Sequence, residues 1–128
     1  MTAAGFAMVG LGAALGAWLR WTLGIWLNTV HPVIPLGTLA ANLGGGFLVG
    51  LAVEFFGLRA ELPLEYRLFV ITGFLGGLTT FSTFSAEAVS LLSRGHPGWV
   101  LAHVGGHLAG SLLLTAAGIY VARALLGN

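Results

Sequence analysis

Residues 68–92 read LFVITGFLGGLTTFSTFSAEAVSLL, an apolar segment that nevertheless has a cluster of hydroxyl groups in its middle. A helix needs about 20 such residues to cross the ~30 Å hydrocarbon layer of a bilayer. Residues 79–87, TTFSTFSAE, place five hydroxyls and two phenylalanines near the midpoint of the segment. Polar groups at that depth are costly unless they have a partner or a role, so this segment is the first place to look for function.

The composition of the whole chain predicts an integral membrane protein. Charged residues make up 7% of the 128 residues and hydrophobic residues 57%, whereas soluble domains are about 25% charged. Four apolar runs, each long enough to span a bilayer, occupy nearly the whole chain at about 3–27, 36–58, 66–93 and 99–126. We therefore expect an all-α protein with a single four-helix transmembrane domain, residues 1–128, surrounded by lipid.

The same composition excludes several classes of function. The chain has no cysteine, which excludes disulfides, thiolate metal sites and thiol catalysis. Its net charge is +1 and it has no basic stripe, so nucleic acid is not an expected partner. It also lacks a Walker-type phosphate loop, so ATP-driven transport is not expected.

The distribution of the arginines does not strongly favour one orientation of the chain in the membrane. Positive residues near the span ends normally stay in the cytoplasm. Here Arg59, Arg67 and Arg123 would lie on one side, and Arg20 and Arg94 on the other. Two outcomes stay open on charge alone. The chain inserts both ways round, which would permit an antiparallel dimer, or the excess of one arginine sets a single orientation.

Each of the four apolar runs contains a pair of glycines four residues apart. Such pairs let helix backbones approach closely, which drives packing where the hydrophobic effect does not act. Glycine is generally common in membrane helices. That general abundance is a poor explanation for a glycine pair in every one of the four runs. The pairs are Gly12 and Gly16, Gly46 and Gly50, Gly73 and Gly77, and Gly106 and Gly110.

Polar residues recur at helical spacing in the second and fourth runs. Thr38 and Asn42 are four residues apart, and the fourth run repeats that spacing, so each set lies along one helix face. Two such stripes on a thin scaffold could line a narrow aqueous path. The alternative is that each of these side chains bonds a carbonyl of its own helix, as a lone Ser or Thr usually does. This alternative is less convincing for Asn42 than for the hydroxyl residues. The residues in the fourth run are His103, His107, Ser111 and Thr115.

The third run is expected to break near its midpoint. Gly76 and Gly77 are followed closely by Thr79 and Thr80, and glycine and β-branched residues have poor helix preference. In a membrane, a broken helix is tolerated where its freed backbone groups are buried or face water. Exposed carbonyls at such a break commonly bind a cation, whereas the amide end of the second half favours an anion.

Phe81 and Phe84 follow this expected break and are three residues apart, so on a helix they share a face with their rings nearly stacked. An aromatic ring is positive around its edge. A ring turned edge-on can therefore solvate an anion weakly, without a fixed charge that would trap it. The alternative is ordinary packing of the two rings.

At these residues the sequence resembles the Fluc fluoride channels of bacteria. The resemblance rests on GFLGGLTTFSTFSAE at 73–87, supported by GAWLRW at 16–21 and GTLAANLGGGFLVG at 37–50, and it covers the whole chain in length and helix count. It implies an antiparallel, dual-topology homodimer with two pores. Such a protein would export fluoride passively through the bacterial plasma (inner) membrane and would not be an enzyme.

The resemblance also implies roles for particular residues. Arg20 and Glu87 would be structural polar residues. The backbone carbonyls of Gly76 and Thr79 from both subunits would hold a structural sodium ion at the dimer interface. The fluoride pore would be lined by Phe81, Phe84, Asn42, Thr38, Ser82, Thr83, His107 and Ser111.

Two positions depart from the family pattern. Arg20 is commonly followed by Tyr in the family, whereas Trp21 follows it here, so a hydroxyl contact is lost. His107 stands where relatives often have a small hydroxyl residue, so it either donates a hydrogen bond in the polar track or only fills space.

Three other functions compete with a fluoride channel. A small dual-topology, proton-coupled multidrug exporter needs an acid in the first helix, where this chain has Arg20. An intramembrane hydrolase would pair Ser82 or Ser85 with His103 or His107, but no acid lies beside either histidine in the sequence, and a base needs a group to orient it. A haem or metal site on the two histidines lacks a third ligand on the same helix.

Overall fold

The computed structural model describes residues 1–127, and all regular structure in that range is helical. Four helical segments are long and apolar enough to cross a membrane, which confirms the expectation of an all-α chain with four candidate spans. The third and fourth begin at Leu64 and Pro97, two residues before the expected starts. Proline fits the first turn of a helix, where its missing N–H has no partner to lose. The elements are α1 (Ala3–Leu27), α2 (Leu36–Leu58), α3 (Leu64–Arg67), η1 (Leu68–Leu75), α4 (Gly76–Leu78), α5 (Phe81–Ser93) and α6 (Pro97–Leu126).

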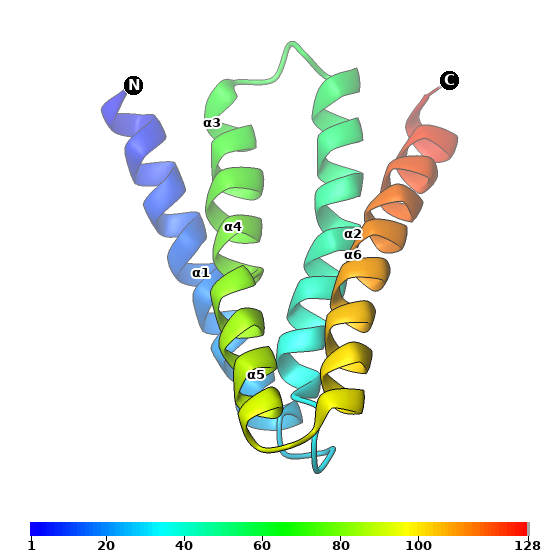
Figure 1. Cartoon of the computed structure of the whole chain (residues 1–128). Helices are drawn as coiled ribbons and strands as arrows, with labels where there is room; N and C mark the ends of the chain where they lie inside the picture. Colours follow the sequence, from blue (N-terminus) through cyan, green and yellow to red (C-terminus); the bar gives the residue numbers. More distant parts are fainter. Residues whose placement is uncertain (128) are drawn as a thin grey trace.

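The four segments form two helix pairs (Figure 1). One pair consists of α1 and the segment from α3 to α5, and the other consists of α2 and α6. The pairs diverge toward the end that holds both termini. They meet at the opposite end, where α5 contacts α6. Side chains from α2, α5 and α6 are therefore brought together in this half of the molecule.

Glycine allows the close approach within each pair. A Cβ atom on Gly16 would overlap the backbone oxygen of Phe74 in η1, and one on Gly50 would overlap that of Thr115 in α6. The fourth glycine pair behaves differently, because the nearest atom to a Cβ on Gly106 is a Leu39 side-chain carbon at 4.0 Å. Three of the four GxxxG pairs thus bring backbones together inside this chain.

The third segment changes conformation along its length. Its first half is π-helical from Leu68 to Leu75, a rare form that is frequent at functional sites. After α4 ends at Leu78, Thr79 and Thr80 have extended backbones with ψ of 154° and 121°. We call these two residues the Thr79–Thr80 link. The Thr80 hydroxyl then accepts a hydrogen bond from the Thr83 N–H at 3.1 Å and caps α5.

Many large apolar side chains are exposed. Trp18, Trp26 and Leu113 are more than 60% exposed, whereas the most deeply buried large side chains are Leu91 and His103. In water an apolar surface of this extent would drive aggregation. The chain therefore suits a lipid environment, in which a helix buries its backbone polar groups internally and exposes apolar side chains.

Candidate functional site

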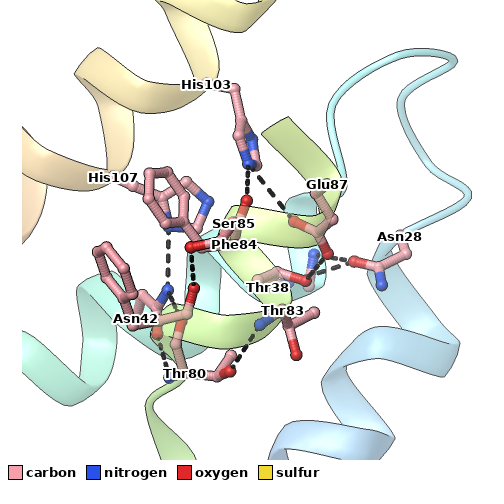
Figure 2. Close-up of polar contacts among 12 residues, drawn as sticks. Asn28, Thr38, Asn42, Thr80, Thr83, Phe84, Ser85, Glu87, His103 and His107 are labelled. Atoms are coloured by element: carbon pink, nitrogen blue, oxygen red, sulfur yellow. Dashed lines mark hydrogen bonds and ion pairs between the residues drawn. The ribbon is translucent and has the colours of Figure 1, made fainter. Parts of the chain in front are cut away.

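Asn42 of α2 connects the Thr79–Thr80 link to α6 (Figure 2). Its Nδ2 donates to the Thr80 carbonyl at 2.9 Å, and its Oδ1 accepts from the Thr80 N–H at 2.7 Å. The same Nδ2 lies 3.0 Å from Nδ1 of His107. One amide side chain thus pairs with both backbone groups of a residue that has left the helix, and it also contacts a histidine on a third element.

This arrangement determines which ring nitrogen of His107 carries the proton. The Thr80 N–H fixes Oδ1 of Asn42 as the acceptor, so the NH2 group must face His107. Nδ1 of His107 then accepts that bond, because a nitrogen facing an N–H donor must offer a lone pair. The neutral imidazole therefore has its proton on Nε2.

A second polar group joins α2, α5 and α6 around Glu87. The Thr38 hydroxyl donates to Oε1 of Glu87 at 2.5 Å, and Oε2 of Glu87 lies 3.6 Å from Nε2 of His103. That nitrogen also lies 3.3 Å from the Phe84 carbonyl. Thr38 is 4% exposed and His103 is 1% exposed. The Asn28 side chain, from the loop before α2, accepts hydrogen bonds from the N–H groups of Gly37 and Thr38 at 2.8 and 3.2 Å.

The rings of Phe81 and Phe84 have different surroundings. Their centroids are 5.4 Å apart and the rings are tilted by 52°, so they are close but not stacked. Phe84 lies against His103, with centroids 5.2 Å apart and nearly parallel planes, and against His107 at 4.8 Å. Phe81 is 80% exposed. Phe84 is therefore packed by the histidines, whereas Phe81 lies on the surface of the single chain.

A cavity of about 510 Å³ lies among α2, α5 and α6. It has mainly apolar walls with a few polar groups, as small-ligand sites commonly have. Six residues that were expected to line the pore or to hold sodium border this cavity, namely Asn42, Thr79, Phe81, Phe84, His107 and Ser111.

The remaining predicted pore residues lie elsewhere. Thr38 faces Glu87 as described above. The Ser82 hydroxyl is exposed and lies 3.3 Å from the Thr80 hydroxyl. Thr83 contributes its backbone N–H to the cap of α5. These three residues do not line the cavity.

The two expected sodium ligands lie at the two ends of α4, Gly76 as its first residue and Thr79 directly after its last, and Arg20 contacts the same element. Gly76 is exposed, and the Thr80 N–H donates to Asn42 rather than back to the Gly76 carbonyl, as a continuous α-helix would require. The Thr79 hydroxyl donates to the Leu75 carbonyl at the end of η1 at 2.8 Å. Nε of Arg20 donates to the Gly77 carbonyl at 3.0 Å, so this guanidinium is paired with backbone.

The hydroxyl groups differ in the carbonyls to which they donate. Ser85 donates to the Phe81 carbonyl one turn earlier in α5, and Thr79 donates to the Leu75 carbonyl at the end of η1, at 2.8 Å each. Thr115 instead donates across to the Gly46 carbonyl of α2 at 2.9 Å. Within residues 1–127 no hydrogen bond joins Ser82 or Ser85 to either histidine, so the nucleophile and base pair that a hydrolase needs is not assembled.

Sequence reasoning missed the contact between Glu87 and His103. The two residues are on different helices, and no spacing rule relates them. Although no acid lies beside either histidine in the sequence, the fold brings Oε2 of Glu87 to 3.6 Å from Nε2 of His103. Glu54 of α2 likewise forms a contact that no spacing rule indicates, a two-point ion pair with Arg123 of α6 with N–O distances of 2.9 and 3.2 Å.

Comparison with known proteins gives consistent results. Residues 7–119 match the sequence model of the family described as CrcB-like protein, Camphor Resistance (CrcB). A protein of Cupriavidus pinatubonensis named fluoride-specific ion channel FluC is 59% identical over 94% of this chain and 96% of its own length. Proteins of the same name from Ralstonia pickettii and Pseudomonas putida are each 58% identical, over 96% and 87% of this chain and over 98% and 87% of their own lengths.

Proposed function

The chain belongs to the family of CrcB-like proteins, and from this membership we infer that it is a fluoride-selective ion channel. It is a multi-pass membrane protein of bacteria and not an enzyme. The observation that carries the inference is the identity of 54–60% to proteins named fluoride-specific channels, over 87% or more of both chains. The multidrug exporter receives no support from these relatives, and the only charged residue of α1 is Arg20.

The cavity among α2, α5 and α6 has suitable chemistry for a small anion. A selective path must replace the water around fluoride with several weak donors. Here these are the Ser111 hydroxyl and the edges of Phe81 and Phe84. Both Nδ2 hydrogens of Asn42 are already used, so Asn42 reaches an ion by exchanging its bond to His107.

Conduction through this path is passive. The cavity lining contains no arginine, so no fixed positive charge traps the ion. An inside-negative potential favours outward movement of an anion by ~2.3 kcal/mol per 100 mV. Fluoride that accumulates in the cytoplasm would therefore leave through the plasma membrane without an energy source of its own.

The working unit in this proposal is an antiparallel homodimer of a chain whose third helix is broken at mid-membrane. Phe81 and Gly76 are exposed on the single chain, and a second copy would cover them. The nearly balanced arginines permit insertion in both orientations. The extended Thr79–Thr80 link frees the Gly76 carbonyl from the helix.

A sodium ion fits this link because carbonyl oxygens are the donors that unwound membrane helices offer to sodium. The carbonyls of Gly76 and Thr79 would hold it, together with the same pair from the partner subunit. The ion would hold the two breaks together and would not take part in moving fluoride.

Fluoride efflux tests the proposed function directly. Purified protein in liposomes should release fluoride when the potential is short-circuited, whereas chloride release under the same conditions should be much slower. Equal release of both anions, or of neither, would contradict the channel assignment.

Dual topology has a separate test because the chain lacks cysteine. A His96→Cys variant places a single thiol in the exposed loop before α6. A membrane-impermeant maleimide added to intact cells should label about half of the protein if both orientations occur. Complete labelling or none would show a single orientation.

The sodium proposal is tested by cation binding to two variants. Binding should survive Thr79→Val, which keeps the backbone carbonyl. It should be lost when Thr79 and Thr80 are both replaced by alanine, which favours a continuous helix. Loss of sodium binding in Thr79→Val would show that the Thr79 side chain is needed and would contradict a site made of backbone carbonyls.

A further inference from the structure

Three metal-ligating side chains converge beside the cavity, on two different helices. Glu87 is on α5, and His103 and His107 are on consecutive turns of α6 (Figure 2). One ligand atom from each residue lies within 4.8 Å of the others. The two imidazole centroids are 4.5 Å apart.

These groups also retain unused binding capacity. Oε2 of Glu87, Nδ1 of His103 and Nε2 of His107 are buried and have no hydrogen-bond partner. The two histidines are 1% and 4% exposed. Buried polar atoms in native proteins are nearly always paired, so the unpaired Oε2 of Glu87 and Nε2 of His107 indicate a ligand that joins them. His103 would contribute Nε2, the ring nitrogen that faces Glu87.

We propose that Glu87, His103 and His107 form a binding site for one Zn²⁺ ion per chain. Two imidazoles and one carboxylate, with a fourth position left for water, are a ligand set that Zn²⁺ takes in proteins. Bonds of ~2.1 Å in tetrahedral geometry hold ligand atoms about 3.4 Å apart. His103 Nε2 and Glu87 Oε2 are already 3.6 Å apart, so a small inward movement of His107 completes the site.

The surrounding residues hold the ligands in position. The Thr38 hydroxyl donates to Oε1 of Glu87, which orients the carboxylate and leaves Oε2 for the ion. The Phe84 ring packs against both imidazoles. Partners of this kind outside the ligand shell normally tune metal affinity.

The site is within reach of solvent from one end of the molecule. His103 is six residues from the start of α6, and Glu87 is six residues from the end of α5. At 1.5 Å per residue, both lie about 9 Å from the loop that joins these helices. His107 additionally borders the cavity, which offers a second route.

Zinc on Nε2 of His107 would change the contact with Asn42. The proton now on Nε2 must leave that nitrogen and return to the ring on Nδ1, because a metal-bound neutral imidazole keeps one N–H. Nδ1 would then face the Asn42 NH2 group as a second donor, and their hydrogen bond would be lost. If the chain conducts fluoride as proposed above, zinc should therefore inhibit conduction.

Zinc titration of the detergent-solubilised full chain, without an affinity tag, tests the site. Calorimetry should show one Zn²⁺ per chain. Affinity should fall at least about tenfold in His103→Gln and in Glu87→Gln, since even outer-shell changes cost 10–100-fold. The matched control is His96→Gln, an exposed loop histidine, which should bind as the parent does. No binding, or equal binding by all variants, would overturn the proposal.

A spectrum of the unaltered protein keeps the test decisive if a variant fails to fold. Co²⁺ in place of Zn²⁺ should give the intense visible bands of a four-coordinate site, and added Zn²⁺ should remove them. A spectrum like that of aqueous Co²⁺ would overturn the site.

Fluoride efflux from liposomes provides the second readout. Efflux by the parent and by His96→Gln should slow as Zn²⁺ fills the site, whereas Glu87→Gln should need at least about tenfold more Zn²⁺. Efflux that is unaffected at full occupancy would overturn the inhibitory coupling. A protein that binds zinc but shows no fluoride efflux at all would count against the channel assignment and not against the metal site.

Discussion

Asn42 and Thr80 form a closed pair in which one side-chain amide bonds both backbone groups of the other residue, at 2.9 and 2.7 Å. Thr80 lies outside the helices, so its N–H and carbonyl would otherwise be unpaired inside the membrane. Asn42 supplies both missing partners from α2. It therefore stabilises an extended backbone in the third segment and at the same time fixes the side chain of His107.

Replacing Asn42 by leucine should destabilise the protein strongly. Leucine is similar in size but leaves the Thr80 N–H and carbonyl without partners, at about 1–3 kcal/mol for each buried group. Thermal unfolding in detergent should show a clear fall in the midpoint, and fluoride efflux should fall with it. A midpoint equal to that of the parent would mean that water replaces the amide.

Replacing Thr38 by valine should also reduce stability, because valine has the same shape but lacks the hydroxyl group that donates a hydrogen bond to Glu87. A buried acceptor left unpaired costs about 1–3 kcal/mol. Thr22→Val is the matched control, since the Thr22 hydroxyl is exposed and bonds only the Trp18 carbonyl of its own helix. Unfolding experiments should therefore separate the two variants, and similar midpoints would show that the Thr38–Glu87 bond contributes nothing net.

The aromatic edges should matter for conduction more than for folding. Phe81→Ile and Phe84→Ile keep the apolar character but remove the positive ring edge, which is worth about 1 kcal/mol. That corresponds to about fivefold slower fluoride efflux from liposomes. Phe55→Ile, at the far end of α2 in an edge contact with Phe56, is the control and should conduct normally. Unchanged efflux in Phe81→Ile and Phe84→Ile would show that the two rings only pack and do not solvate the ion.

Alanine at two glycines of α2 should have opposite effects. Gly50→Ala would place a Cβ against the Thr115 carbonyl of α6, and overpacking of this kind costs about 1–3 kcal/mol. Gly44→Ala meets open space and removes a poor helix former, so stability should stay level or rise by up to about 1 kcal/mol. Equal midpoints for the two variants in thermal unfolding would contradict the close packing of α2 on α6.

Much of the fold could be predicted from the sequence because it depends on local properties. The four spans follow from the length of the apolar runs, since a bilayer of fixed thickness sets how many residues a helix needs. The poor helix preference around Thr79 and Thr80 is likewise a property of these residues themselves, and both have extended backbones in the structure. The glycine pairs predicted close packing, but not which helix each pair would meet.

The candidate site was predictable only in part. Asn42, Phe84, His107 and Ser111 were identified from the sequence, and the structure brings them to one cavity. His103 and Glu87 are 16 residues apart on opposite sides of a loop, and no periodicity connects them. The Thr38–Glu87 bond spans 49 residues in the same way.

The sequence by itself determined a four-helix membrane protein with a weak point in its third segment. These features follow from apolar length and local backbone preference. Only the tertiary structure decided that Asn42 faces Thr80 and that Glu87 faces Thr38 and His103. The backbone contacts at Gly16 and Gly50 determine which faces of α1 and α2 pack against their neighbours, and these contacts exist only after the helices have packed.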